Sequence, residues 1–188
     1  MKRFIPIAAV LLLLMTGCAA ETGSKESAGA EQSIPSITEQ PNSMPEEMPD
    51  QFDFLVRFGY GEVTKNEVNT YEDTVTKDLV VKGTATADIT LTMDEMRSIY
   101  KKMREINIMA DKELVPAPKV DVCHVTPYSV DSWKITINDE TKTFTWSGEN
   151  CEPTDDAKDL LELRTYIQHL VAGKEAYKAL PEPEGGYD

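Results

Sequence analysis

The chain has 188 residues, of which 40% are apolar and 28% are charged, a balance typical of a globular domain and unlike that of a disordered or multi-span membrane protein. Its 19 Lys and Arg residues against 33 Asp and Glu residues give a formal net charge of −14, which argues against a groove that holds nucleic-acid phosphates. Three cysteines and two histidines are too few for a disulfide-dense scaffold or a Cys/His zinc module.

The first 17 residues have the organisation of a secretory signal peptide. Lys2 and Arg3 form a short positive region, and an almost unbroken apolar run follows over residues 4–15. This run is too short to span a hydrocarbon core about 30 Å thick, which needs about 20 residues. Residues 1–17 are therefore predicted to be cleaved off and to take no part in the fold.

The end of this segment, Met15-Thr16-Gly17-Cys18, resembles the lipobox of bacterial lipoproteins. The resemblance implies that diacylglycerol is attached to Cys18, that cleavage occurs before Cys18, and that the mature protein starts there. Two acyl chains suffice for stable anchoring. The expected location is thus the extracytoplasmic face of the cell membrane, with the membrane as a partner through the lipid on Cys18. An ordinary signal peptide, in which Cys18 is incidental, is the alternative.

A flexible acidic linker is predicted over residues 18–50. Residues 20–50 are rich in Glu, Ser, Pro and Gln, and they contain seven acidic residues and one base. Such a segment buries too little apolar surface to offset its chain entropy. It is expected to hold a single domain, residues 51–181, away from the membrane, with residues 182–188 as a polar tail.

The first half of the domain has the period-two pattern of strands. Every second residue of 52–60 is aromatic or aliphatic, which predicts a strand with one buried face. Residues 63–71 and 74–82 are weaker strand candidates, and residues 84–91 alternate polar with apolar side chains. Outer faces rich in threonine favour antiparallel pairing with one side in water.

Two amphipathic helices are predicted after these strands. Thr92 and Glu95 form a capping box, and apolar residues follow at helical spacing as far as residue 106. The second helix begins around residues 153–156, with acidic residues in its first turn. Residues 108–131 contain three prolines and are predicted to be an extended surface connection. This order of elements predicts an α+β domain, in which an antiparallel sheet has two helices packed on one face.

A β-hairpin is predicted over residues 132–146, between the two helices. If residues 139–140 form a two-residue loop, Trp133 faces Trp146 across the hairpin, and aromatic pairs of this kind stabilise sheets. The dipeptide Asp-Glu lacks the glycine that two-residue turns favour, so a longer loop is an open alternative.

Cys123 and Cys151 remain when Cys18 is acylated, and an even pair outside the cytoplasm predicts a disulfide. One alternative is a soft-metal site that these two cysteines form with His124 and His169, and another is a pair of free redox thiols. The chain has no Cys-x-x-Cys motif, and the four metal ligands would have to converge from distant segments. The disulfide is therefore the preferred interpretation.

Catalytic and metal-binding motifs are not found in the sequence. There is no Gly-x-Ser-x-Gly elbow, and 33 acidic residues guarantee neighbouring carboxylates, so that no pair is informative. A group of acids near the second helix suggests Ca²⁺, but it lacks the calcium-loop spacing, and favourable charge at a helix N-terminus explains it. The group consists of Glu152, Asp155, Asp156 and Asp159. No catalytic residue, metal or cofactor is predicted.

Three stretches of the domain resemble small uncharacterised lipoproteins of Gram-positive endospore-forming bacteria. They are the strand that ends in Phe-Gly-Tyr-Gly at 58–61, the helix over 92–106, and Tyr-Lys-Ala-Leu-Pro at 177–181. The resemblance supports the location and implies no known activity. The expected function is a membrane-anchored, non-catalytic binding or interaction module of the cell envelope, whose partner is an envelope protein or a small ligand. The alternatives are a small envelope hydrolase that uses acidic residues, and a cation or redox sensor that uses Cys123 and Cys151.

Overall fold

The computed structural model describes residues 42–61, 63–117 and 123–187. The predicted signal peptide, Cys18 and the linker as far as residue 41 lie outside this part of the chain. The described residues belong to one structural unit, and their six strands form a single sheet.

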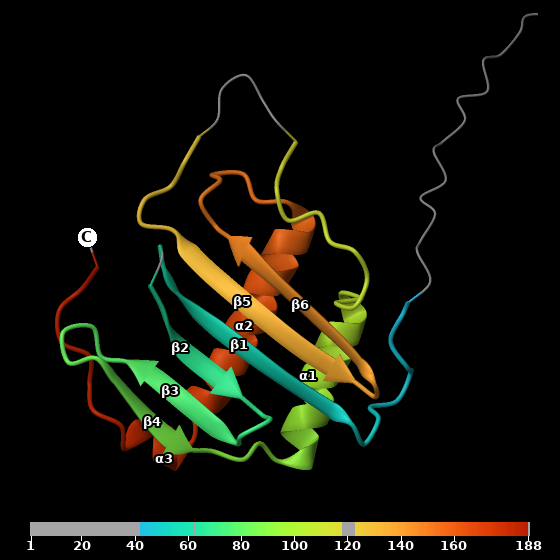
Figure 1. Cartoon of the computed structure of the whole chain (residues 1–188), viewed down its shortest axis with the longest axis horizontal. Helices are drawn as coiled ribbons and strands as arrows, with labels where there is room; N and C mark the ends of the chain where they lie inside the picture. The colour runs from blue at the N-terminus through green and yellow to red at the C-terminus, as the bar shows by residue number, and fades with distance from the viewer. Residues whose placement is uncertain (1–41, 62, 118–122, 188) are drawn as a thin grey trace, which may run out of the picture. The chain divides into compact units, whose positions relative to one another are not determined.

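The sheet has the strand order β4-β3-β2-β1-β5-β6, and all neighbouring strands are antiparallel (Figure 1). The strands are β1 (Phe52–Tyr60), β2 (Val63–Asn69), β3 (Thr74–Asp78), β4 (Thr84–Asp88), β5 (Ser129–Ile137) and β6 (Glu140–Ser147). The long strand β1 therefore lies in the interior of the sheet, between the meander of β2 to β4 and the hairpin of β5 and β6.

Two long helices, α1 (Met93–Glu105) and α2 (Asp155–Ala172), cover one face of this sheet and lie behind the strands in Figure 1. The even-numbered residues of β1 from 52 to 58 are buried on that face, as their alternation predicts. The prediction of an antiparallel sheet with two helices on one face is confirmed. A third helix, α3 (Glu175–Lys178), follows α2 and has four residues.

Both long helices begin where their capping residues predict. The Thr92 side chain accepts a hydrogen bond from the Glu95 backbone, and the Glu95 carboxylate accepts one from the Thr92 backbone, which completes the capping box. The Thr154 side chain caps α2 through the backbone N–H of Ala157. Gly173 follows the last residue of α2, so this helix ends at the glycine that the sequence offers as its end.

The loop of the β5–β6 hairpin lies one residue earlier than predicted. Asn138 and Asp139 form the loop, because Asn138 adopts a left-handed φ of 54°, which asparagine tolerates better than most residues. Trp133 therefore faces Phe144 across the hairpin, with ring centroids 6.3 Å apart. The predicted pairing of Trp133 with Trp146 is wrong.

The ordered domain begins before residue 51. The Met44 side chain is 4% exposed and belongs to the hydrophobic core. The Pro45 carbonyl accepts hydrogen bonds from Tyr100 Oη at 2.8 Å and from Arg104 Nε at 3.0 Å, both on α1. The prediction that the flexible linker extends to residue 50 is therefore wrong at its C-terminal end, where one methionine attaches a polar segment to the domain.

The predicted polar tail also belongs to the domain. The backbone of Glu184 donates to the Leu79 carbonyl and accepts from the N–H of Val81, each at 3.2 Å. The Tyr187 hydroxyl donates to the Asp78 carboxylate at 2.6 Å. These contacts place the tail alongside the connection between β3 and β4, although its composition gives no indication of an ordered structure.

The connection between α1 and β5 is only partly superficial. It starts with Ile108 and Met109, which are buried in the core, and β5 begins at Ser129, three residues before the predicted hairpin. The prolines that follow Met109 explain why the rest of this connection forms no strand or helix within its described residues.

Candidate functional site

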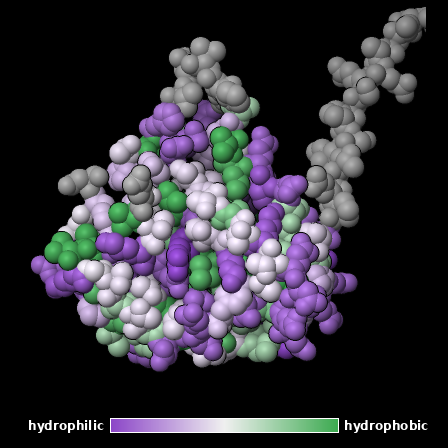
Figure 2. Space-filling view, viewed as in Figure 1, coloured by the Kyte–Doolittle hydropathy of each residue, from purple (hydrophilic) through white to green (hydrophobic). Residues whose placement is uncertain are grey.

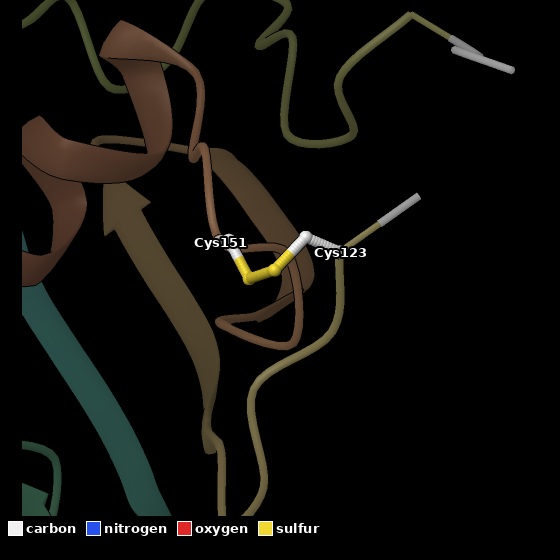
Figure 3. Close-up of a disulfide and its surroundings, with 2 residues drawn as sticks. All are labelled: Cys123 and Cys151. Carbon is white, nitrogen blue, oxygen red and sulfur yellow. A yellow bond between two sulfur atoms is a disulfide. The ribbon is translucent and has the colours of Figure 1, made fainter. Parts of the chain in front are cut away.

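Cys123 and Cys151 form the predicted disulfide, with an S–S distance of 1.99 Å and a Cα–Cα distance of 5.4 Å (Figure 3). Both residues are exposed. Because the two sulfur atoms are bonded to each other, they are neither free thiols nor metal ligands in this structure. No group of three His, Cys, Asp or Glu side chains suited to a metal ion is found within the described ranges.

Backbone pairing brings the two cysteines together beyond the end of the β5–β6 hairpin. The N–H of Val125 donates to the Glu149 carbonyl at 2.7 Å, and the N–H of Cys151 donates to the Cys123 carbonyl at 3.2 Å. The hairpin is thus prolonged beyond its open end, before the first residue of β5 and after the last residue of β6. The disulfide joins the two chains of this prolongation, across a sequence separation of 28.

A groove of about 650 Å³ lies beside the disulfide. One side is formed by Glu113, Pro116 and Ala117. The other side is formed by Cys151 and by residues at the start of α2 as far as Lys158. The groove is therefore a junction between the chain that leaves α1 and the chain that enters α2.

Polar contacts attach the two sides of the groove to each other. Lys112 Nζ forms an ion pair with Asp156 Oδ1 at 2.8 Å, and the backbone N–H of Glu113 donates to Asp156 Oδ2, also at 2.8 Å. The Thr154 hydroxyl, which caps α2, donates to the Glu113 carbonyl at 2.5 Å. These contacts hold the two sides of the groove together at the N-terminal end of α2.

Acidic residues outnumber basic ones in the described lining of the groove. Its acidic residues there are Glu113, Glu152 and Asp155, and its basic residue is Lys158. Lys158 Nζ donates to Asp155 Oδ1 at 2.7 Å, and this hydrogen bond lowers the pKa of Asp155. Of the acids considered for calcium, Asp155 and Asp156 thus each pair with a lysine, and both lie in the first turn of α2, where negative charge is favourable.

A buried carboxylate lies on the core face of β5, where the sequence analysis identified no site. Asp131 is 0% exposed and occupies the same face as Trp133 and Ile135. Burial raises the pKa of Asp131 to about 6, although the nearby Arg164 opposes the rise. In the sequence, the only indication of this site is that Asp131, a polar residue, occupies a position that the alternation of apolar residues assigns to the buried face. It lies just before the predicted hairpin.

The only cation paired with Asp131 among the described residues is Arg164 on α2. Arg164 Nε donates to Asp131 Oδ2 at 3.3 Å, its guanidinium lies 5.2 Å from the Phe58 ring centroid, and its Nη1 donates to Gln168 at 3.2 Å. Asp131 Oδ1 and Trp133 Nε1 have no hydrogen-bond partner among the described residues. Because Asp131 is sealed off from solvent, this pair connects α2 to the sheet and does not reach a substrate.

The second face of the sheet is open, and Figure 2 shows it as a mixture of hydrophilic and intermediate residues with scattered apolar patches. Its side chains are held by contacts with one another. The Thr136 hydroxyl is hydrogen-bonded to the Tyr71 hydroxyl at 2.7 Å and to the Thr141 hydroxyl at 2.8 Å. Lys134 Nζ lies 4.4 Å from the Tyr71 ring centroid.

Both histidines are exposed, and they lie on different elements. His124 is next to the disulfide and pairs through its backbone with Asn150, whereas His169 lies in the last turn of α2. Of the four residues of the alternative metal site, Cys123, His124 and Cys151 are therefore neighbours, whereas His169 lies at the other end of α2. No helix among the described residues is both long and apolar enough to cross a bilayer.

Comparison with known proteins does not assign this geometry to a family: no protein-family model matches the chain, and no curated protein does.

Proposed function

We propose that the chain is a lipid-anchored extracytoplasmic module, which binds a polar component of the cell envelope through the open face of its sheet and catalyses no reaction. The lipobox-like sequence that ends at Cys18 supports the anchor. The open face supports the binding role, and it is the observation on which the proposal rests.

The open face offers hydrogen-bonding groups that are already oriented. Tyr71, Thr136 and Thr141 form a chain of hydroxyl contacts, and Lys134 lies over the ring of Tyr71. Side chains held in this way lose little rotamer freedom when a ligand binds, which lowers the cost of association. Hydroxyl, ammonium and aromatic groups on one surface suit a ligand rich in polar groups.

The arrangement of acids gives less support to a hydrolase. Glycoside hydrolysis needs a pair of carboxyl groups, one on each side of the substrate site. The carboxyl groups whose pKa is raised are those of Asp131 and Asp159, among the described residues. Asp131 is sealed in the core, and neither of the two lines the groove beside the disulfide. A binding role therefore accounts for the geometry better than a hydrolytic one.

The substitution Lys134→Glu is expected to weaken binding to isolated envelope material by tenfold or more. It reverses a charge on the open face and removes the cation over Tyr71. The measurement is cosedimentation of the soluble Cys18→Ser form with washed wall and membrane fractions, followed by calorimetry. The control Lys101→Glu makes the same charge change on α1, where the side chain is 78% exposed. Equal binding by the two variants would contradict binding through the open face.

The anchor is tested separately through Cys18. The native chain is expected to partition into a detergent phase and to start at a diacylglycerol-modified Cys18, whereas Cys18→Ser moves the chain to the aqueous phase. Two acyl chains at about 0.8 kcal/mol per buried methylene make this a nearly complete change. The control Cys123→Ser removes a different cysteine and should leave partitioning unchanged. Intact mass spectrometry that finds an unmodified N-terminus would contradict the anchor.

A further inference from the structure

We propose that the Cys123–Cys151 disulfide is an exchange site, which an extracytoplasmic dithiol protein reduces by attack on Cys151 Sγ while the domain stays folded. This role goes beyond binding through the open face and uses different residues. It rests on four features of the site: access to the disulfide, attachments that do not involve sulfur, the groove beside Cys151, and the charge of that groove.

The disulfide is accessible to a reactant. Both cysteines are exposed, and neither belongs to the hydrophobic core. Thiol–disulfide exchange requires a thiolate to reach one of the two sulfur atoms, so access controls the rate in a folded protein. Here both cysteine residues are exposed and lie outside the core, so a reactant approaches them without displacing a core residue.

The segments joined by the disulfide are also held by contacts that do not involve sulfur. The backbone hydrogen bond between Val125 and Glu149 aligns the two chains. The ion pair between Lys112 and Asp156, together with the hydrogen bond from Thr154 to Glu113, attaches the far side of the groove to α2. Because these contacts do not depend on the S–S bond, its reduction does not require the sheet or the helices to open.

The groove distinguishes Cys151 from Cys123. Cys151 lines the groove of about 650 Å³, whereas Cys123 lies outside its described lining. Pro116 and Pro153 contribute apolar surface to this groove, so a segment of a protein can pack there as well as a small thiol. A reactant seated there approaches Cys151 Sγ, and Cys123 Sγ becomes the leaving group.

The charge of the groove selects the kind of thiol. Among the described lining residues Glu113 is acidic, and the one base, Lys158, is already paired with Asp155. An acidic surface raises the local concentration of cations and lowers that of anions. The reactant is therefore a dithiol whose surroundings are neutral or basic, rather than an acidic thiol peptide.

The reaction balances with this one reactant. A thiolate of the dithiol attacks Cys151 Sγ, the S–S bond breaks, and Cys123 leaves as a thiolate that takes up a proton. The second thiol of the dithiol, as its thiolate, then attacks its partner sulfur in the mixed disulfide and releases Cys151 as a thiolate, which is also protonated. The domain gains two thiols, and the dithiol becomes a disulfide.

The test uses the soluble Cys18→Ser chain and two small thiols of opposite charge, cysteamine and 3-mercaptopropionate. At low salt, and after each rate is divided by that thiolate's rate with an uncharged model disulfide, cysteamine is expected to react roughly tenfold faster. Mass spectrometry after acid quenching should find the adduct on Cys151. Trp133 and Trp146 are buried, so unchanged tryptophan fluorescence reports that the domain remains folded during the reaction. Dithiothreitol should then give the fully reduced, folded chain.

Matched charge variants separate the groove from the overall negative charge of the chain. Glu113→Gln should lower the preference for cysteamine two- to threefold, because Glu113 lines the groove. Asp139→Asn removes the same charge in the loop at the opposite end of the hairpin and should leave the preference unchanged. The proposal is overturned by equal effects of these variants, by an adduct mainly on Cys123, or by reaction only after tryptophan fluorescence reports unfolding. Each of these outcomes leaves binding through the open face intact.

Discussion

Replacing Arg164 by methionine is expected to lower the free energy of unfolding by about 3–5 kcal/mol at pH 8, and by much less at pH 4. Arg164 Nε donates to Asp131 Oδ2 at 3.3 Å, and Asp131 has no exposed surface. Methionine keeps an apolar chain of similar length next to Phe58 but removes the charge. The ionised carboxylate would then be buried without a cation, which costs more than the loss of one hydrogen bond.

The pH dependence follows from the pKa of Asp131. Burial raises this pKa from its ordinary 3.8 to about 6, so the folded chain holds the proton more tightly than the unfolded chain. The stability that the protonated carboxyl contributes is complete below 3.8 and is lost as the pH rises through 6; two pKa units correspond to roughly 3 kcal/mol. Arg164 lowers the pKa of Asp131 in the folded chain. Without Arg164 this pKa is higher, so stability continues to fall to a higher pH.

Urea unfolding at pH 4, 6 and 8, followed by tryptophan fluorescence, measures both effects. The variant Asp131→Asn cannot titrate at this position, and its stability should vary less between pH 4 and pH 7 than that of the unsubstituted chain. The double variant Asp131→Asn/Arg164→Met should recover much of the stability that Arg164→Met loses at pH 8. Equal losses for Arg164→Met at pH 4 and pH 8 would contradict a role for the buried carboxylate.

The elements that were predicted correctly are those specified by local chemistry. The capping box of Thr92 and Glu95 and the cap at Thr154 satisfy backbone groups within one turn, so they define helix starts without reference to the rest of the fold. The alternation of β1 likewise follows from one buried face. The α+β architecture could therefore be read from the order and spacing of these elements.

The errors lie where long-range contacts or single backbone angles decide. The hairpin loop depends on the left-handed conformation of Asn138, which moves the pairing of the two strands. Met44 and Tyr187 attach segments of polar composition through contacts with residues far away in the sequence. Composition describes the average of such a segment, whereas one buried side chain or hydroxyl decides whether it is ordered.

The candidate site was predicted only in part for the same reason. The pairing of Cys123 with Cys151 follows from counting cysteines under the expectation of an oxidising compartment, a global argument that needs no geometry. The groove beside Cys151 depends on where Pro116 and the start of α2 meet. The Asp131–Arg164 pair joins a strand and a helix and had no local motif.

Removal of the disulfide by the double substitution Cys123→Ser/Cys151→Ser is expected to lower the free energy of unfolding by about 3.5 kcal/mol, the loop-entropy value for a loop of this length. The crosslink spans a sequence separation of 28 and therefore restricts the unfolded chain far more than the folded one. Urea unfolding of oxidised and substituted chains measures the loss. The fold itself should persist, because neither cysteine contributes to the core.

The same free energy determines how readily the folded domain is reduced. If the crosslink stabilises the fold by about 3.5 kcal/mol, the equilibrium constant for reduction is roughly 300-fold smaller in the folded chain than in the unfolded chain, since about 1.4 kcal/mol corresponds to a factor of ten. An exchange partner must therefore be a strong reductant, which a dithiol that closes its own disulfide can be. The measurement is the oxidised fraction in dithiothreitol redox buffers, with and without denaturing urea. Equal fractions in the two conditions would show that the crosslink adds no stability, and the expected loss in the double variant would then fail as well.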